Sequence, residues 1–214
     1  MGGDDKKRVS LGRELKLGVL ISGGGRTLLN LHERILAGTL SAKIAVVISS
    51  RADSAGVVRA RNAGLPVEIV TRGDHPCDSF HSEIARRLAS VDLVCLAGFL
   101  SLWRIPPEFA GRVLNIHPAL LPAFGGRGMY GHHVHEAVLA SRATESGCTV
   151  HFCDNEYDHG PILLQRRVPI FAADTPDTLA ERVFEQECLA YPEAIQLVSD
   201  GRVHIEDRTV EIRP

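Results

Sequence analysis

A mostly apolar segment at 113–116 carries Asn115 and is followed by His117. Pro118 then ends the segment. Side chains two positions apart on a strand point to the same side, so this amide and imidazole would project together. The amide donates hydrogen bonds, and histidine titrates near neutral pH. Such a pair could polarise a carbonyl group and move a proton. A turn-capping asparagine and a structural histidine are the commoner arrangement, so the pair alone leaves its role open.

An acidic turn further along the chain offers a partner for His117. Asp154, Glu156 and Asp158 precede a His-Gly-Pro sequence at 159–161. Carboxylates in such turns are usually solvated. An aspartate facing His117 would instead raise the pKa of the histidine, fix its tautomer and stabilise the imidazolium.

A glycine loop at 23–25 follows an apolar run and precedes a helical pattern. Glycines let the backbone approach a ligand closely, and a helix N-terminus favours an anion such as phosphate. Arg26 would add a positive charge there. The loop lacks the GK[ST] of a P-loop, and GxGxxG fails because position 28 is Leu. A loop that only turns the chain is an equally good interpretation.

The elements around these residues alternate between strands and helices. Apolar runs predict strands, and apolar residues at helical spacing predict helices between them, with strands at 17–22, 43–49, 66–70 and 93–99 and helices at 27–38, 54–64 and 77–91. This order predicts an α/β fold, a Rossmann-like three-layer sandwich with a mostly parallel sheet. Ligands of such sheets lie beyond the carboxyl ends of the strands, which places the glycine loop, residues 98–103 and Asn115 with His117 on one rim.

The second half of the chain predicts an antiparallel edge and a helical end. Strands at 147–153 and 162–168 are joined by a short loop, and a glycine-rich loop at 123–131 could cover a site. Asp174 or Thr175 would cap a long helix that Pro192 splits or kinks. A small hairpin around Glu206-Asp207 follows.

Composition limits the classes of function. With 214 residues, we expect a loose arm at 1–14 and a single domain at 15–214. A net charge of −2 gives no broad footprint for nucleic acid or an anionic membrane. Neither a membrane span nor a signal peptide is expected, which predicts a cytoplasmic protein. The sequence leaves a homodimer open.

The cysteines and histidines of the sequence give little support for a metal site or a disulfide. The five cysteines include no CxxC pair and predict reduced thiols. His132, His133 and His135 invite a zinc site, but helical spacing does not aim all three at one ion. We therefore expect no metal. We expect His133 to form a hydrogen bond near a ligand.

Taken in order, several motifs resemble the folate-dependent formyltransferases of purine biosynthesis. They are the glycine loop, LAGF at 96–99, NIHPALLP at 115–122, VHF at 150–152 and D-x-GP at 158–161. The resemblance covers about residues 16–200. It implies transfer of a formyl group from 10-formyltetrahydrofolate, as co-substrate, to the amine of 5-phosphoribosylglycinamide.

The resemblance also implies roles for individual residues. The catalytic residues would be Asn115, His117 and Asp158, with His151 behind them. The folate pocket would comprise Leu100, Ser101, Leu102, Trp103, Asn115, Cys153, Asp154, Asn155, Glu156 and Tyr157. The glycinamide substrate would be bound by Gly24, Gly25, Arg26, Thr27 and Glu187.

The implied mechanism has the amine attack the formyl carbon. Asn115 and a protonated His117 would stabilise the oxyanion, and Asp158 would keep His117 charged. Through water, the pair would pass a proton from the amine to the folate nitrogen. Neither a metal nor a covalent intermediate is required.

Three positions depart from the usual family pattern. Arg26-Thr27 replaces a Ser-Asn type of dipeptide, which leaves the side-chain contacts to phosphate open. The stretch at 75–80 has no evident basic residue for the folate tail. His159 replaces a glycine, where a positive φ is less comfortable.

Other functions remain possible from the sequence. A methionyl-tRNA formyltransferase would need a basic tRNA-binding domain, and a formyltetrahydrofolate hydrolase usually carries a regulatory domain before the core; neither is expected here. A formyltransferase acting on an amino sugar could share the same triad. A nucleotide-binding regulator would explain the glycine loop but would leave Asn115, His117 and Asp158 without a role.

Overall fold

The computed structural model describes residues 14–75, 78–206 and 208–214. Seven strands form one sheet in the order β3-β2-β1-β4-β5-β6-β7. The first five strands in this order are parallel to one another, whereas β6 pairs antiparallel with both β5 and β7. The strands are β1 (Leu15–Ile21), β2 (Ala42–Ser49), β3 (Val67–Ile69), β4 (Leu93–Leu96), β5 (Val113–His117), β6 (Glu145–Phe152) and β7 (Ile162–Pro169). The α/β fold with an antiparallel edge is confirmed.

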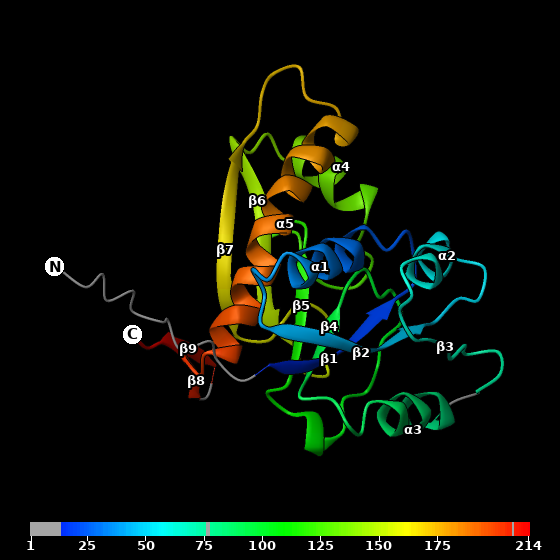
Figure 1. Cartoon of the computed structure of the whole chain (residues 1–214). Helices are drawn as coiled ribbons and strands as arrows, with labels where there is room; N and C mark the ends of the chain where they lie inside the picture. Colours follow the sequence, from blue (N-terminus) through cyan, green and yellow to red (C-terminus); the bar gives the residue numbers. More distant parts are fainter. Residues whose placement is uncertain (1–13, 76–77, 207) are drawn as a thin grey trace, which may run out of the picture.

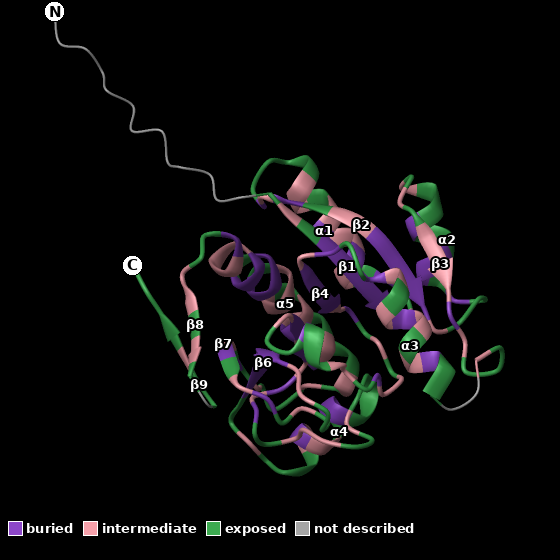
Figure 2. Cartoon of the chain, turned by 90° about the horizontal axis from the view of Figure 1, so that it is seen from below, coloured by how far each residue is buried: buried purple, intermediate pink, exposed green. Residues whose placement is uncertain are grey.

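Helices cover both faces of the sheet (Figure 1). They are α1 (Arg26–Leu36), α2 (Ala55–Asn62), α3 (Asp78–Arg87), α4 (His132–Ala140) and α5 (Pro176–Ser199). Alternate residues of β1 face opposite cores: Val19 packs with α1, α4 and α5, and Leu20 packs with α3 and the 3-10 turn η1 (Pro107–Phe109). Figure 2 shows the central strands β1, β2 and β4 buried along most of their length. Such burial explains their continuous apolar runs.

The long helix α5 runs through Pro192 without a break, so the prediction that this proline splits the helix is wrong. Proline cannot donate to the carbonyl four residues earlier, which is that of Cys188. The side chain of Arg34 donates to this carbonyl oxygen at 3.5 Å instead. Thr175, one of the two caps expected from the sequence, caps the helix and forms a capping box with Thr178.

The chain ends in the predicted hairpin, formed by β8 (Val203–Glu206) and β9 (Thr209–Ile212). Asp207, most of the predicted arm and Cys77 lie outside the described residues. The four described cysteines are free thiols. None of the helices in the described part of the chain is long and apolar enough to cross a membrane.

Candidate active site

A cavity of about 530 Å³ opens at the carboxyl ends of β1, β4 and β5. Parallel sheets bind their ligands at this edge. Of the catalytic, folate-binding and substrate-binding residues that the family resemblance implies, those that line it are Arg26, Thr27, Leu100, Ser101, Leu102, Trp103, Asn115, His117, Cys153, Asp154, Glu156, Tyr157, Asp158 and Glu187. Gly24, Gly25 and Asn155 are not among its lining residues.

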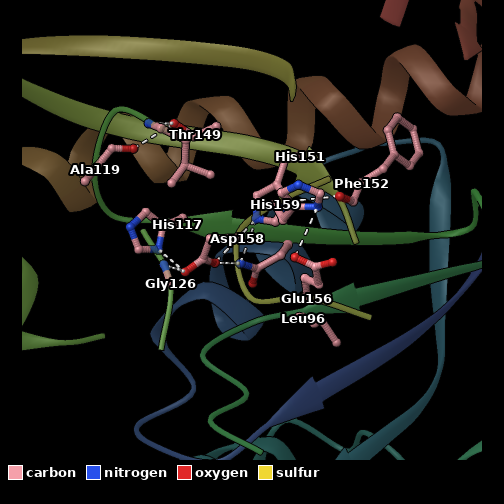
Figure 3. Close-up of polar contacts among 12 residues, drawn as sticks. Leu96, His117, Ala119, Gly126, Thr149, His151, Phe152, Glu156, Asp158 and His159 are labelled. Atoms are coloured by element: carbon pink, nitrogen blue, oxygen red, sulfur yellow. Dashed lines mark hydrogen bonds and ion pairs between the residues drawn. The ribbon is translucent and has the colours of Figure 1, made fainter. Parts of the chain in front are cut away.

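Asn115 belongs to a polar cluster with His151 and Asp158. Figure 3 shows His117, His151 and Asp158 of this cluster close to one another. The side-chain amide of Asn115 donates to Nε2 of His151 at 3.1 Å and to Oδ1 of Asp158 at 3.3 Å. The β5–β6 register brings this contact about, because Asn115 stands opposite His151. Nδ1 of His151 lies 2.9 Å from the carbonyl oxygen of Phe152, so His151 donates from Nδ1 and accepts from Asn115 at Nε2.

His117 is 3% exposed, and both of its ring nitrogens have polar neighbours. Nε2 donates to the carbonyl oxygen of Phe124 at 2.8 Å, and Nδ1 lies 3.6 Å from Oδ2 of Asp158. The Phe124 carbonyl therefore fixes the proton of the neutral imidazole on Nε2. Nδ1 is left to accept a proton beside a carboxylate.

The expected effect of Asp158 on His117 is only partly found. Burial is the largest influence on the pKa of His117 and lowers it, whereas Asp158 and the Phe124 carbonyl raise it. Asp158 therefore acts in the expected direction, but burial outweighs it and the net direction of the pKa is downward. Taking a charged imidazolium out of water costs more than one carboxylate at 3.6 Å returns.

Asp158 remains a carboxylate despite its burial. Burial raises its pKa, but His151, His117 and the backbone N–H of Gly126 together lower it below the usual value. The Gly126 N–H donates to Oδ2 at 2.9 Å. Three separate segments thus meet at this one carboxylate.

The turn that carries Asp158 has the positive φ at a different residue from the one we expected. The φ of Asp158 is 52°, and His159 has no positive φ. Gly160 is required for another reason, because a Cβ there would lie 1.9 Å from the carbonyl oxygen of Phe152. His159 pairs instead with Asp154, with its Nδ1 2.8 Å from Oδ2.

The segment that follows β5 is fixed by a hydrogen-bond network that we did not predict from the sequence. Oγ1 of Thr149, which is fully buried, donates to the carbonyl of Ala119 at 2.7 Å and accepts from the N–H of Leu121 at 3.0 Å. Gln165 donates to Thr149 and to the carbonyl of Leu121, both at 2.9 Å. This network fixes the start of the loop that supplies the Phe124 carbonyl. Thr149 and Gln165, polar residues on the two predicted strands at 147–153 and 162–168, are the sequence signals that could have revealed it.

One side of the cavity is an apolar slot along residues 100–103. Trp103, 3% exposed, donates from Nε1 to the carbonyl oxygen of His81 at 3.1 Å. Asn155 does not enter the slot; it accepts from the N–H of Ile105 at 2.7 Å and ties the acidic loop to the slot segment. Arginines from outside the 75–80 stretch stand nearby, since Arg72 donates to the carbonyl of Leu102 and Arg104 donates to Asp78.

The other side of the cavity lies between α1 and α5. Gly25 has a φ of 73°, and a Cβ there would lie 2.8 Å from Cα of Gly56, so the glycine loop also serves to pack α1 against α2. Glu187 of α5 lines this side, and burial raises its pKa to about 7. Arg26 pairs with Glu181, with Nη1 2.6 Å from Oε1.

The three histidines at the start of α4 have separate surroundings. No group of three or more metal-ligating side chains occurs in the described residues. His132 pairs with Asp177 at 2.7 Å, and His133 lies 3.5 Å from Glu136. His135 is buried, has no partner for Nδ1, and lines the cavity; burial lowers its pKa to about 4.

Comparison with known proteins places this site in a family. Residues 15–195 match the family described as formyl transferase, and the chain belongs to it. Within the family it groups with the phosphoribosylglycinamide formyltransferases. It is 37% identical over 198 residues to the Haemophilus influenzae enzyme of that name, with 90% of this chain and 91% of the relative covered.

Other comparisons agree on the group. The chain is 42% identical over 201 residues to the chloroplastic phosphoribosylglycinamide formyltransferase of Vigna unguiculata, but spans only 63% of that relative's length. The crystal structure of glycinamide ribonucleotide transformylase 1 from Symbiobacterium toebii is 40% identical, with a TM-score of 0.87 and 94% of this chain and 95% of that one covered. A formyltetrahydrofolate deformylase from Pseudomonas syringae shares the fold, with a TM-score of 0.82 at 22% identity.

Proposed function

We propose that this formyl transferase moves the formyl group of 10-formyltetrahydrofolate to the amine of 5-phosphoribosylglycinamide. The products are formylglycinamide ribonucleotide and tetrahydrofolate. The observation that carries the proposal is the convergence of Asn115, His117 and Asp158 in one buried cluster on the cavity. Relatives with this function match nearly the whole chain.

Attack of the amine on the formyl carbon creates an oxyanion and releases a proton. The Asn115 amide is the oxyanion donor, because its contact to Asp158 is long at 3.3 Å and an oxyanion can take its place. His117 is neutral at rest and receives the proton at Nδ1 through water. Asp158 then stabilises the imidazolium until the proton passes to the departing folate nitrogen.

The two ends of the cavity fit the two substrates. The apolar slot at Leu102 and Trp103, with the acidic loop that carries Tyr157, suits the flat ring of the folate. The glycine loop and Glu187 suit the phosphate and the glycinamide. We place the reaction in the cytoplasm, although one plant relative is named as chloroplastic.

The test is an acceptor comparison with purified protein. With 10-formyltetrahydrofolate as donor, we expect formylated product from phosphoribosylglycinamide and little consumption with water or an amino sugar as acceptor. Mass spectrometry identifies the product. Folate turnover without formylated glycinamide would overturn the assignment and point to a hydrolase.

A further inference from the structure

The C-terminal hairpin of β8 and β9 takes no part in the proposed mechanism, yet its turn contacts the loop that carries Asp158. The apolar side chains of Val203, Ile205 and Val210 pack against the main core, and β9 lies beside β7 (Figure 1). These apolar contacts hold the hairpin on the fold. Arg208, in the turn of the hairpin, makes contacts of a different kind.

The guanidinium of Arg208 contacts the acidic loop, residues 154–160, at two residues. Nη2 donates to the carbonyl oxygen of His159, which directly follows Asp158 in the chain. Nη1 lies 3.9 Å from Oδ2 of Asp154. Nδ1 of His159 is 2.8 Å from the same oxygen and donates its proton there. A glycine, which is usual in the family at position 159, could not make this last contact, so the histidine adds a bond between the two ends of the loop.

The acidic loop needs such contacts to keep its shape. Asp158 has a φ of 52°, a backbone conformation that non-glycine residues rarely adopt and that persists where the surroundings hold it. Asn155 ties the loop to Ile105, and Arg208 ties it to the hairpin directly beside Asp158. Four residues of the loop line the cavity: Asp154, Glu156, Tyr157 and Asp158.

We propose that Arg208 is a positioning residue: through His159 it holds the turn of Asp158 and, with it, the donor side of the cavity. This inference rests on the proposed function and gives the C-terminal hairpin a role in it. Arg208 is not among the described residues that line the cavity, so it acts through the loop. Arginine suits this role, because its planar group can bond a carbonyl oxygen with one nitrogen and face a carboxylate with another.

The alternative is that the contact only fixes the hairpin to the rest of the fold. The side chains of Arg208 and Asp154 are 58% and 36% exposed, and ion pairs with such exposure contribute little to stability. Anchoring alone therefore predicts unchanged kinetics when Arg208 is replaced. Positioning predicts a kinetic effect with stability nearly kept.

The experiment compares Arg208→Met and Arg208→Lys with wild type. For Arg208→Met we expect KM for 10-formyltetrahydrofolate to rise and kcat to fall, each about three- to tenfold. The KM for phosphoribosylglycinamide and the midpoint of urea unfolding should stay unchanged. Arg208→Lys should recover part of the loss, since an ammonium can still donate to the carbonyl of His159. Hydrogen–deuterium exchange of residues 154–160 should become faster in Arg208→Met.

Arg213→Met is the matched control, because Arg213 follows the same hairpin, is 55% exposed and pairs with Glu211. It should equal wild type in every measurement. Wild-type kinetics in Arg208→Met would overturn the proposal, and so would a lowered urea midpoint with equal losses for both substrates, which would mark the contact as an anchor. If wild type yields no formylated glycinamide, the proposed function fails instead, and the exchange of the loop still decides whether Arg208 holds it.

Discussion

The two ends of the cavity hold their polar groups in different ways. At the end of β5, His117 is 3% exposed and the Asp158 side chain 10% exposed, and backbone groups bond both of them. Between α1 and α5, Arg26 and Glu181 are half-exposed and bond each other. The buried cluster cannot lose a member without leaving a polar group unpaired, whereas the exposed pair can be exchanged as a unit. Under the proposed function, the chemistry would lie at the first end and acceptor binding at the second.

Removing the amide of Asn115, at the β5 end of the cavity, is the substitution from which we expect the largest loss of kcat. Asn115→Leu should lower kcat about 100- to 1000-fold, because the oxyanion loses its donor. Part of the damage will be structural, since His151 and Asp158 lose a partner. Steady-state kinetics measure the loss of turnover, and circular dichroism measures the structural damage. Asn62→Leu, at the exposed end of α2, is the control, and an equal loss there would remove the special role of Asn115.

Gly125 tests whether the loop after β5 positions the cluster. A Cβ there would lie 2.5 Å from Cδ2 of Leu121 and 3.1 Å from Cβ of Asp158. Gly125→Ala should lower kcat about tenfold, because small displacements of reacting groups are costly, and should destabilise the fold by about 1–3 kcal/mol. Gly73→Ala meets only an ordinary contact at 3.6 Å and should behave as wild type. Unchanged turnover in Gly125→Ala would contradict positioning by this loop.

His135 lines the cavity, and its shifted pKa predicts how the stability of the fold depends on pH. Burial lowers its pKa to about 4 from 6.5, so the unfolded state takes up the proton first as the pH falls. Stability should therefore decrease from pH 6.5 toward pH 4. His135→Gln removes this contribution, on the order of 2 kcal/mol across that window. Urea unfolding at several pH values measures it. The exposed His133 is the control, and an identical slope in His133→Gln and His135→Gln would sink the prediction.

Glu187 should make stability depend on pH in the opposite direction, with a smaller effect. Burial raises its pKa from 4.5 to about 7, so the folded state keeps the proton longer and stability decreases as the pH rises from 4.5 to 7. The residue keeps some contact with solvent, so we expect Glu187→Gln to gain only about 1 kcal/mol at pH 8 and nothing near pH 4.5. Glu193→Gln should show no such difference between the two pH values. A stability gain that is equal at both pH values would contradict a pKa origin.

Much of the fold could be predicted because buried parallel strands appear as continuous apolar runs. The continuity of α5 through Pro192 could not, because a proline usually ends or kinks a helix and the carbonyl that it leaves free is bonded by Arg34 of another helix. Tertiary contacts of this kind leave no local signal.

Some features of the candidate site could likewise be predicted from the sequence, and others could not. Strand spacing predicted that Asn115 and His117 would share a side, and both indeed contact Asp158. The direction of the His117 pKa could not be predicted, because burial depends on packing from elements far apart in the chain. Nor could the Phe124 carbonyl or the Gly126 N–H, since backbone groups belong to every residue type.

The measurement that tests the central claim most directly is a single-turnover reaction of Asp158→Asn beside wild type. Both proteins are saturated with 10-formyltetrahydrofolate and phosphoribosylglycinamide, and donor binding is measured on the same samples. We predict that formyl transfer falls about 100-fold or more while the donor still binds, because His117 loses the carboxylate that stabilises its charge. A variant that transfers the formyl group at nearly the wild-type rate would contradict the account.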